Sequence, residues 1–95
     1  MISPYVRRQR LAAELEQLRD DAGLTHAELA TRIGESRMKI TRLENGRVIR
    51  DGQATVMKII DTLGVTGDRW SSIMDVARDA AERGWWASYG TMPLS

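Results

Sequence analysis

HAELATRIGESRMKITRLENG, residues 26–46, is the stretch that decides the fold. It holds two short helical patterns, and Gly34 stands at the turn between them. A T-x-x-E capping box beginning at Thr25 predicts the start of the first helix. Gly34 ends that helix because glycine readily adopts the left-handed conformation of a helix terminus. Ser36 is placed to cap the second helix, which we expect over residues 37–44.

The small and branched residues of this stretch fit two helices that meet at a sharp angle. Ala30 supplies a small side chain where the helices touch, and Ile33, Ile40 and Leu43 supply the apolar anchors. Counted from His26, the residues Ala, Gly and Ile fall at positions five, nine and fifteen. These positions define the helix-turn-helix, so the spacing predicts that motif.

The outward face of the second helix carries the candidate contacts. With Ile40 and Leu43 buried, the exposed residues are Arg37, Met38, Lys39, Thr41 and Arg42. The N-terminal part of this helix enters the major groove of DNA in helix-turn-helix proteins. Arginine can bond guanine with two hydrogen bonds, and Met38 can offer an apolar contact to a thymine methyl. Any one of these arginines alone is equally a solvated surface charge; together with the motif they predict a DNA-facing surface.

The charge distribution agrees with this prediction. The net charge of the chain is only +1, but residues 32–50 hold six basic and two acidic residues, a local charge of +4. From Gly52 onward four basic residues face five acidic ones. A local excess of this kind is typical of a nucleic-acid footprint, although a solvated helix face can also produce it.

Three further helical patterns surround the motif. We expect one from Val6 or Arg7 to Ala22, one from about Gln53 to Leu63, and one from Thr66 or Asp68 to about Arg83. No stretch alternates apolar and polar residues for long enough to be a strand. The predicted fold class is therefore all-α, a compact bundle of five short helices with an apolar tail.

Length and composition exclude several other classes. Ninety-five residues fit one domain. The chain has no cysteine and one histidine, His26, so we expect no disulfide and no metal site. There is no apolar run of ~18 residues and no secretory signal, so a cytoplasmic, nucleoid-associated location is expected. Carboxylates such as Asp20 and Asp21 have no His, Cys or Lys converging on them, which disfavours an enzyme, and no cofactor is expected.

From Arg10 to Val65 the chain resembles the Cro/C1-repressor type of helix-turn-helix domain, the lambda-repressor-like xenobiotic-response-element family. GLTHAELATRIGESRMKITRLENG, residues 23–46, carries most of this resemblance. His26 stands where the family commonly has a glutamine that braces a DNA phosphate, and His26 can still donate to one. The resemblance further implies base reading by Ser36, Arg37, Met38 and Arg42, phosphate contacts by Asn45 and Arg47, and a buried ion pair between Arg19 and Glu44.

The two ends resemble an actinobacterial subgroup of these regulators through RRQRLAAELEQLRDDAGLT, residues 7–25, and RDAAERGWWASYG, residues 78–90. In that subgroup the Gly-Trp-Trp stretch marks the junction to a longer C-terminal domain, which is thought to serve a small protein encoded nearby. We therefore expect a DNA-binding domain over residues 1–84 and a tail or junction over residues 85–95. The tail gathers apolar surface without helical period, in Trp85, Trp86, Tyr89, Met92 and Leu94. At least one of its tryptophans is expected to be buried, on its own bundle or against a second copy.

Together the residues and the resemblance predict a bacterial, repressor-like transcription regulator that binds double-stranded DNA. It is expected to act as a homodimer on a palindromic operator, with half-sites roughly 34 Å apart. The alternative is a helix-turn-helix module for protein interaction, antitoxin-like, that reads no DNA. Salt-dependent DNA affinity distinguishes the two, because only the neutralisation of phosphates gives a steep salt slope.

Overall fold

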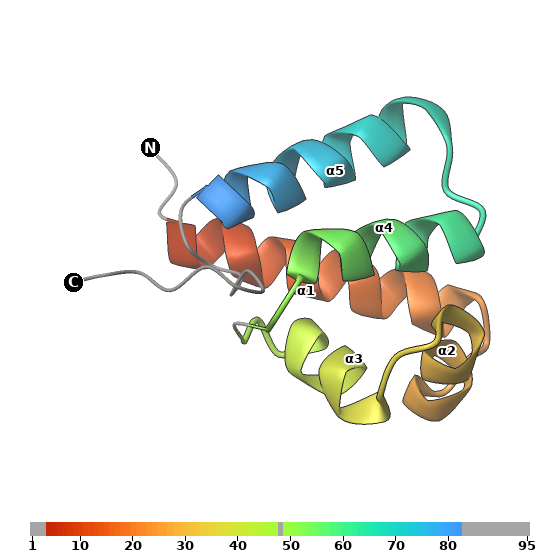
Figure 1. Ribbon diagram of the computed structural model, residues 1–95. Coiled ribbons are helices and arrows are strands. Elements are labelled where there is room, and N and C mark those ends of the chain that lie inside the picture. The colour runs from red at the N-terminus through yellow and green to blue at the C-terminus, as the bar shows by residue number, and fades with distance from the viewer. Residues whose placement is uncertain (1–3, 48, 83–95) are drawn as a thin grey trace.

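A computed structural model describes residues 4–47 and 49–82 of the chain, with side chains for residues 7–47 and 49–80. In this part of the chain every regular element of more than one residue is an α-helix, which confirms the predicted all-α class. The helices are α1 (Pro4–Asp21), α2 (His26–Ile33), α3 (Arg37–Glu44), α4 (Gly52–Thr62) and α5 (Gly67–Glu82). Figure 1 shows them joined by short connections.

The helix boundaries differ slightly from the predicted ones, for local reasons. Helix α1 begins at Pro4, before the predicted Val6 or Arg7, because the fixed φ of proline suits the first position of a helix. Helix α4 begins at Gly52, after Asp51, whose φ of 54° is left-handed. The periodicity of apolar side chains indicates the buried face of a helix. It gives no information about terminal turns whose side chains are not buried, so the helix ends are predicted less well.

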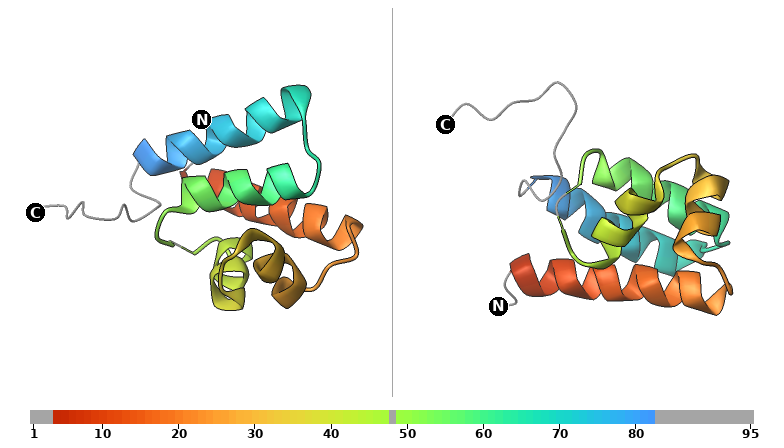
Figure 2. Two further views of the ribbon diagram at one scale, coloured as in Figure 1. Left: turned by 45° about the vertical axis from the view of Figure 1, so that its right-hand side comes forward. Right: turned by 90° about the horizontal axis from the view of Figure 1, so that it is seen from below.

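The helices form two groups around α1. Helices α4 and α5 run antiparallel and pack on each other, and both contact α1. Helices α2 and α3 pack together and contact α4 and α1, respectively, at the other end of the bundle. In Figure 2, the view from below brings α2 and α3 toward the reader, with α1 running alongside. Helices α3 and α5 therefore lie on opposite sides of the layer formed by α1 and α4 (Figure 1).

One apolar core joins all five helices. Its fully buried side chains come from α1, α2, α3, α4 and α5: Leu15, Leu29, Ile40, Leu43, Val56, Ile59, Ile60 and Met74. With the other core residues they recur at spacings of three and four, as Leu11, Leu15 and Leu18 do in α1, so each helix presents one stripe to the core. The burial of these stripes fixes which face of α3 remains outside. None of the described helices has the length and apolar character needed to cross a membrane.

Candidate nucleic-acid interface

The turn between α2 and α3 is built by local hydrogen bonds. At the start of α2 the Thr25 hydroxyl accepts from the Glu28 backbone N–H at 3.1 Å, and the Glu28 carboxylate accepts from the Thr25 N–H at 2.9 Å. These bonds hold the pKa of Glu28 below its usual value. Gly34 closes α2 with a φ of 72°, and the Ser36 hydroxyl caps α3 by accepting from the Lys39 N–H at 3.2 Å. The capping box and both caps predicted from the sequence are thus present.

Buried side chains then fix the angle between α2 and α3. Ala30 and Ile33 of α2 are buried, and so are Ile40 and Leu43 of α3. With Ile40 and Leu43 turned into the core, the opposite side of α3 faces solvent. Two short helices packed in this way, one presenting a polar outer face, form a helix-turn-helix.

A buried carboxylate ties α3 to α1 and α2. The Glu44 carboxylate accepts from Arg19 Nε at 2.8 Å and from Arg19 Nη2 at 3.0 Å, and both side chains are almost wholly buried. Arg19 Nη1 also donates to the Leu24 carbonyl at 2.7 Å. The hydrogen bonds to Glu44 raise the pKa of Arg19 above its usual value. Arg19 and Glu44 therefore form a bidentate pair that fixes the end of α3 on α1.

His26 joins the same cluster. Its Nε2 lies 3.0 Å from Glu44 Oε1, and about a third of its side chain is exposed. Glu44 is already charged and paired with Arg19, so its oxygen acts as the acceptor and His26 Nε2 carries the proton. This contact links the first residue of α2 to the last residue of α3. The sequence alone assigned His26 only to DNA and gave no sign of this partner.

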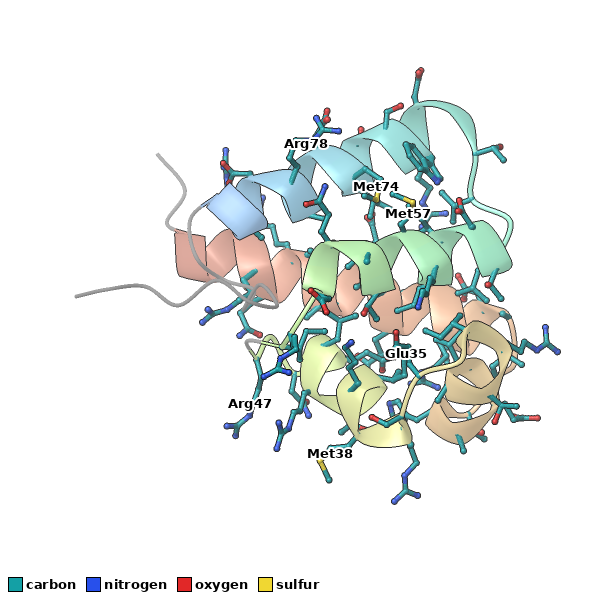
Figure 3. The ribbon with its side chains drawn as sticks, viewed as in Figure 1. Glu35, Met38, Arg47, Met57, Met74 and Arg78 are labelled. Atoms are coloured by element: carbon teal, nitrogen blue, oxygen red, sulfur yellow. The ribbon has the colours of Figure 1, made fainter. Side chains whose placement is uncertain are left out.

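A second carboxylate fixes the turn from the other side. Glu35 accepts from Lys58 of α4 at 3.0 Å and from Lys39 of α3 at 3.3 Å. The hydrogen bond from Lys58, and then that from Lys39, hold the pKa of Glu35 below its usual value. Figure 3 places Glu35 between α4 and the α2–α3 pair. The spacing of Glu35 and Lys39 could have suggested their pair, but nothing local in the sequence signals Lys58.

The predicted contact residues divide into two groups in the structure. Those that point outward without an internal partner for their side chains, among the described residues, are Arg37, Met38, Arg42, Asn45 and Arg47. Met38 is 62 % exposed, the most exposed large apolar side chain described, and Figure 3 shows it and Arg47 pointing away from the bundle. Those whose side chains are engaged are His26, Ser36, Lys39 and Thr41, the last through its hydroxyl donating to the Arg37 carbonyl at 3.1 Å.

The loop after α3 is held close to α1. Gly46 is buried with a φ of 70°, and a Cβ at this position would collide with the side-chain amide of Gln9. Helix α1 thus supports the backbone that carries Asn45 and Arg47. The sequence gave no indication that Gln9 contacts Gly46, which lies 37 residues away along the chain.

The arrangement suits the binding of a polyanion. In the described part of the chain, no three His, Cys, Asp or Glu residues group closely enough to hold a metal ion. No carboxylate described in the structure lies within ion-pair distance of Arg37, Arg42 or Arg47, although the carboxylates of Glu35 and Glu44 are on the same motif. Those two carboxylates are turned inward, so the outer face of α3 and its loop is left positive.

Comparison with known proteins agrees with this geometry. A family model described as "helix-turn-helix domain" matches residues 10–71, which span α1 to the beginning of α5. No curated protein sequence and no solved structure matches the chain. The match covers most of the chain and includes the whole α2–turn–α3 unit, so the chain belongs to the helix-turn-helix domain family.

Proposed function

We propose that this chain binds double-stranded DNA sequence-specifically, as the DNA-reading part of a bacterial transcription regulator. The observation that carries the proposal is the unpaired positive face of the motif. Arg37, Arg42 and Arg47 are exposed there without acidic partners among the described residues, whereas Arg7 and Arg19 elsewhere are paired. The phosphates of DNA supply the missing negative charges, and their release of counterions favours binding.

In this proposal α3 lies in the major groove and its outward residues read bases. Arg37 stands in the first turn of α3 and can bond guanine O6 and N7 together, while Arg42 lies about one turn beyond Met38 on the same side of the helix. Met38 offers its exposed side chain to a thymine methyl. Asn45 and Arg47, at the end of α3, contact the backbone phosphates and fix the register.

The engaged residues have narrower roles at the interface. The Lys39 ammonium group donates one hydrogen bond to Glu35, and its other two N–H groups can donate to a phosphate. The Thr41 hydroxyl already donates to the Arg37 carbonyl, so it can only accept from a base amino group or offer its methyl. Ser36 accepts at the helix cap and can still donate to DNA. The Nε2–H group of His26 donates to Glu44. The other ring nitrogen, Nδ1, can donate to a phosphate only when it also carries a hydrogen, that is, when the ring is doubly protonated.

The proposal also covers the oligomeric state, the cellular location and a protein partner. Two copies related by a two-fold axis would place two α3 helices one DNA turn apart on a palindromic operator. The chain would act in the bacterial cytoplasm on the nucleoid, in the repressor-like manner that the family resemblance implies. A small protein encoded nearby would reach it through a further C-terminal domain.

The test is selection of bound sequences from a random DNA pool at physiological salt, followed by affinity measurements on the selected site. Arg37→Ala should weaken binding to that site by roughly 1–3 kcal/mol and relax the preference at one base position in each half-site. Arg47→Ala should weaken all sequences alike and reduce the salt slope. Arg69→Ala, which removes an exposed arginine of α5 outside the motif, is the matched control and should change neither.

Two results would contradict the proposal. If the folded chain enriches no sequence, or binds DNA without a salt slope, the motif serves protein interaction instead. If Arg37→Ala and Arg47→Ala behave identically over a panel of sequences, the division into base readers and phosphate contacts is wrong.

A further inference from the structure

A groove lies between α1 and α5, away from α3. It has a volume of about 280 Å³. Its apolar lining comes from Leu11 of α1 and from Ile73 and Val76 of α5, and its polar lining comes from Arg7, Arg10 and Glu14 of α1 and from Ser72 of α5. Leu11 and Ile73 are core residues, whereas Val76 is only half-buried and leaves apolar surface open to water.

The lining of the groove selects an aromatic occupant. The Arg7 guanidinium is held by Asp79 of α5, with Nη1 2.9 Å from Oδ2, so it has a fixed place in the groove lining. Arg10 is exposed and has no ion pair among the described residues. A flat ring on the aliphatic lining, beside the guanidinium groups of Arg7 and Arg10, gains both burial and cation–π attraction. An aliphatic side chain gains only the first.

We propose that one indole of the Trp85–Trp86 pair of the same chain occupies this groove. Residues 83–95 lie outside the described residues, and in the sequence only Arg83 and Gly84 stand between the tryptophans and Glu82, where α5 ends. Helix α5 rises about 1.5 Å per residue, so Val76 lies about 9 Å back from that end. Residues 83–86 span up to about 13 Å when extended, which is enough to return to the level of Val76.

This docking is independent of DNA reading and goes beyond it. The groove is lined by α1 and α5. Helix α3 lies across the bundle from α5 (Figures 1 and 2). An indole in the groove covers the exposed part of Val76 and joins the end of α5 to the start of α1. It stabilises the bundle and leaves Arg37 and Arg47 free.

The decisive measurement needs no substitution. Nuclear Overhauser contacts between the Trp85 or Trp86 rings and the methyl groups of Leu11, Ile73 and Val76 are expected in the 95-residue chain. A sample that mixes differently isotope-labelled copies separates contacts within one chain from contacts between two. Contacts seen only between copies would overturn the proposal, because the groove would then take a second chain. An absence of contacts with these methyl groups would overturn it as well.

A pair of matched variants gives a second readout. Ser72 lines the groove, and its neighbour Ser71 is exposed and does not line it. In a Trp70→Phe background, Ser72→Glu should pair with Arg7 and Arg10, displace the indole and raise acrylamide quenching of the remaining tryptophans toward that of the unfolded chain. Ser71→Glu should leave quenching low. Equal quenching in the two variants would contradict the proposal.

Discussion

At the scale of single residues, the partner of each polar atom decides what the residue can do. Glu44 shows this most clearly, because its carboxylate serves Arg19 and His26 together. Its negative charge is neutralised by Arg19 inside the protein and does not repel DNA. Arg37 and Arg47, with no such partner among the described residues, keep their full charge toward solvent. The same residue types thus hold the fold together in one place and form the proposed contact surface in another.

The pair of Arg19 and Glu44 should dominate the stability of the motif. Glu44→Ala leaves an almost buried guanidinium without its counter-charge, so the free energy of unfolding should fall by about 3–5 kcal/mol in urea titrations. The control is Arg78→Ala, which breaks an exposed pair with Asp75 and should cost less than about 1 kcal/mol. Equal losses in the two variants would mean that Arg19 finds solvent or another acceptor when Glu44 is removed.

Asp51 holds a backbone conformation that side chains disfavour. Its φ is 54°, its side chain makes no capping bond, and its carbonyl accepts from the Thr55 N–H and hydroxyl. Asp51→Gly should therefore be more stable than Asp51→Ala by about 1 kcal/mol, because a left-handed conformation costs alanine roughly this much. Neither variant keeps the carboxylate, so thermal unfolding of the two isolates the backbone effect. An alanine variant as stable as the glycine one would show that α4 begins differently.

At the scale of elements, the placement of α3 depends on contacts from three other helices. Arg19 of α1 holds its end, His26 of α2 reaches the same carboxylate, and Lys58 of α4 holds the turn before it. Gln9 of α1 packs against the loop that follows. An eight-residue helix is too short to be stable alone in water, so these contacts keep α3 in its place.

The contact between α4 and the turn should depend on pH. Lys58 and Lys39 lower the pKa of Glu35 from its ordinary value of 4.5, so the folded chain holds this carboxylate charged to lower pH than the unfolded chain does. The stabilisation is complete above that ordinary value and is lost as the pH falls through the lowered pKa. Glu35→Gln should therefore lower the melting temperature at neutral pH.

The difference between the native chain and Glu35→Gln should shrink as the pH falls from about 5 toward 2. Ala54→Gln, at an exposed position of α4, removes no titratable group and should show no such convergence. A melting difference for Glu35→Gln that is constant with pH would assign the effect to packing instead of charge.

At the scale of the whole molecule, the bundle separates two surfaces. The positive face lies on α3 and its loop, and the groove that we assign to the tail lies between α1 and α5 on the other side. The core of five helices joins the two, so each can act without covering the other.

The proposed two-fold assembly fixes the spacing of the half-sites. With α3 of each copy in successive major grooves, the selected site should contain two inverted half-sites roughly 34 Å, or about 10 base pairs, apart. Inserting about five base pairs turns one half-site to the opposite face of the duplex and should remove the gain from binding two copies. Mass by light scattering on the free and DNA-bound chain checks the stoichiometry. Binding that is insensitive to the insertion would identify a monomeric reader.

The sequence by itself determined the local structure of this protein. Thr25, Gly34 and Ser36 set the ends of α2 and α3 through hydrogen bonds and backbone conformations that involve near neighbours only. The spacing of Ala30 and Ile40 set which faces are buried, because helical periodicity fixes direction around an axis. The helix-turn-helix and the exposure of Arg37, Met38 and Arg42 could therefore be predicted, with small errors at helix ends that bury nothing. Lys39 and Thr41, also predicted to be exposed, are only partly so.

Only the tertiary structure decided which polar side chains form hydrogen bonds and ion pairs inside the protein. Glu35 meets Lys58 across 23 residues, Gln9 meets Gly46 across 37, and Glu44 receives His26 as well as Arg19. Contacts of this kind depend on close distances between elements, about 3 Å for the hydrogen bonds, which the packing of the core sets and no local pattern records. The same packing left the groove beside Val76, a half-buried residue of α5. Periodicity tells which way a side chain points, and packing decides what it meets there.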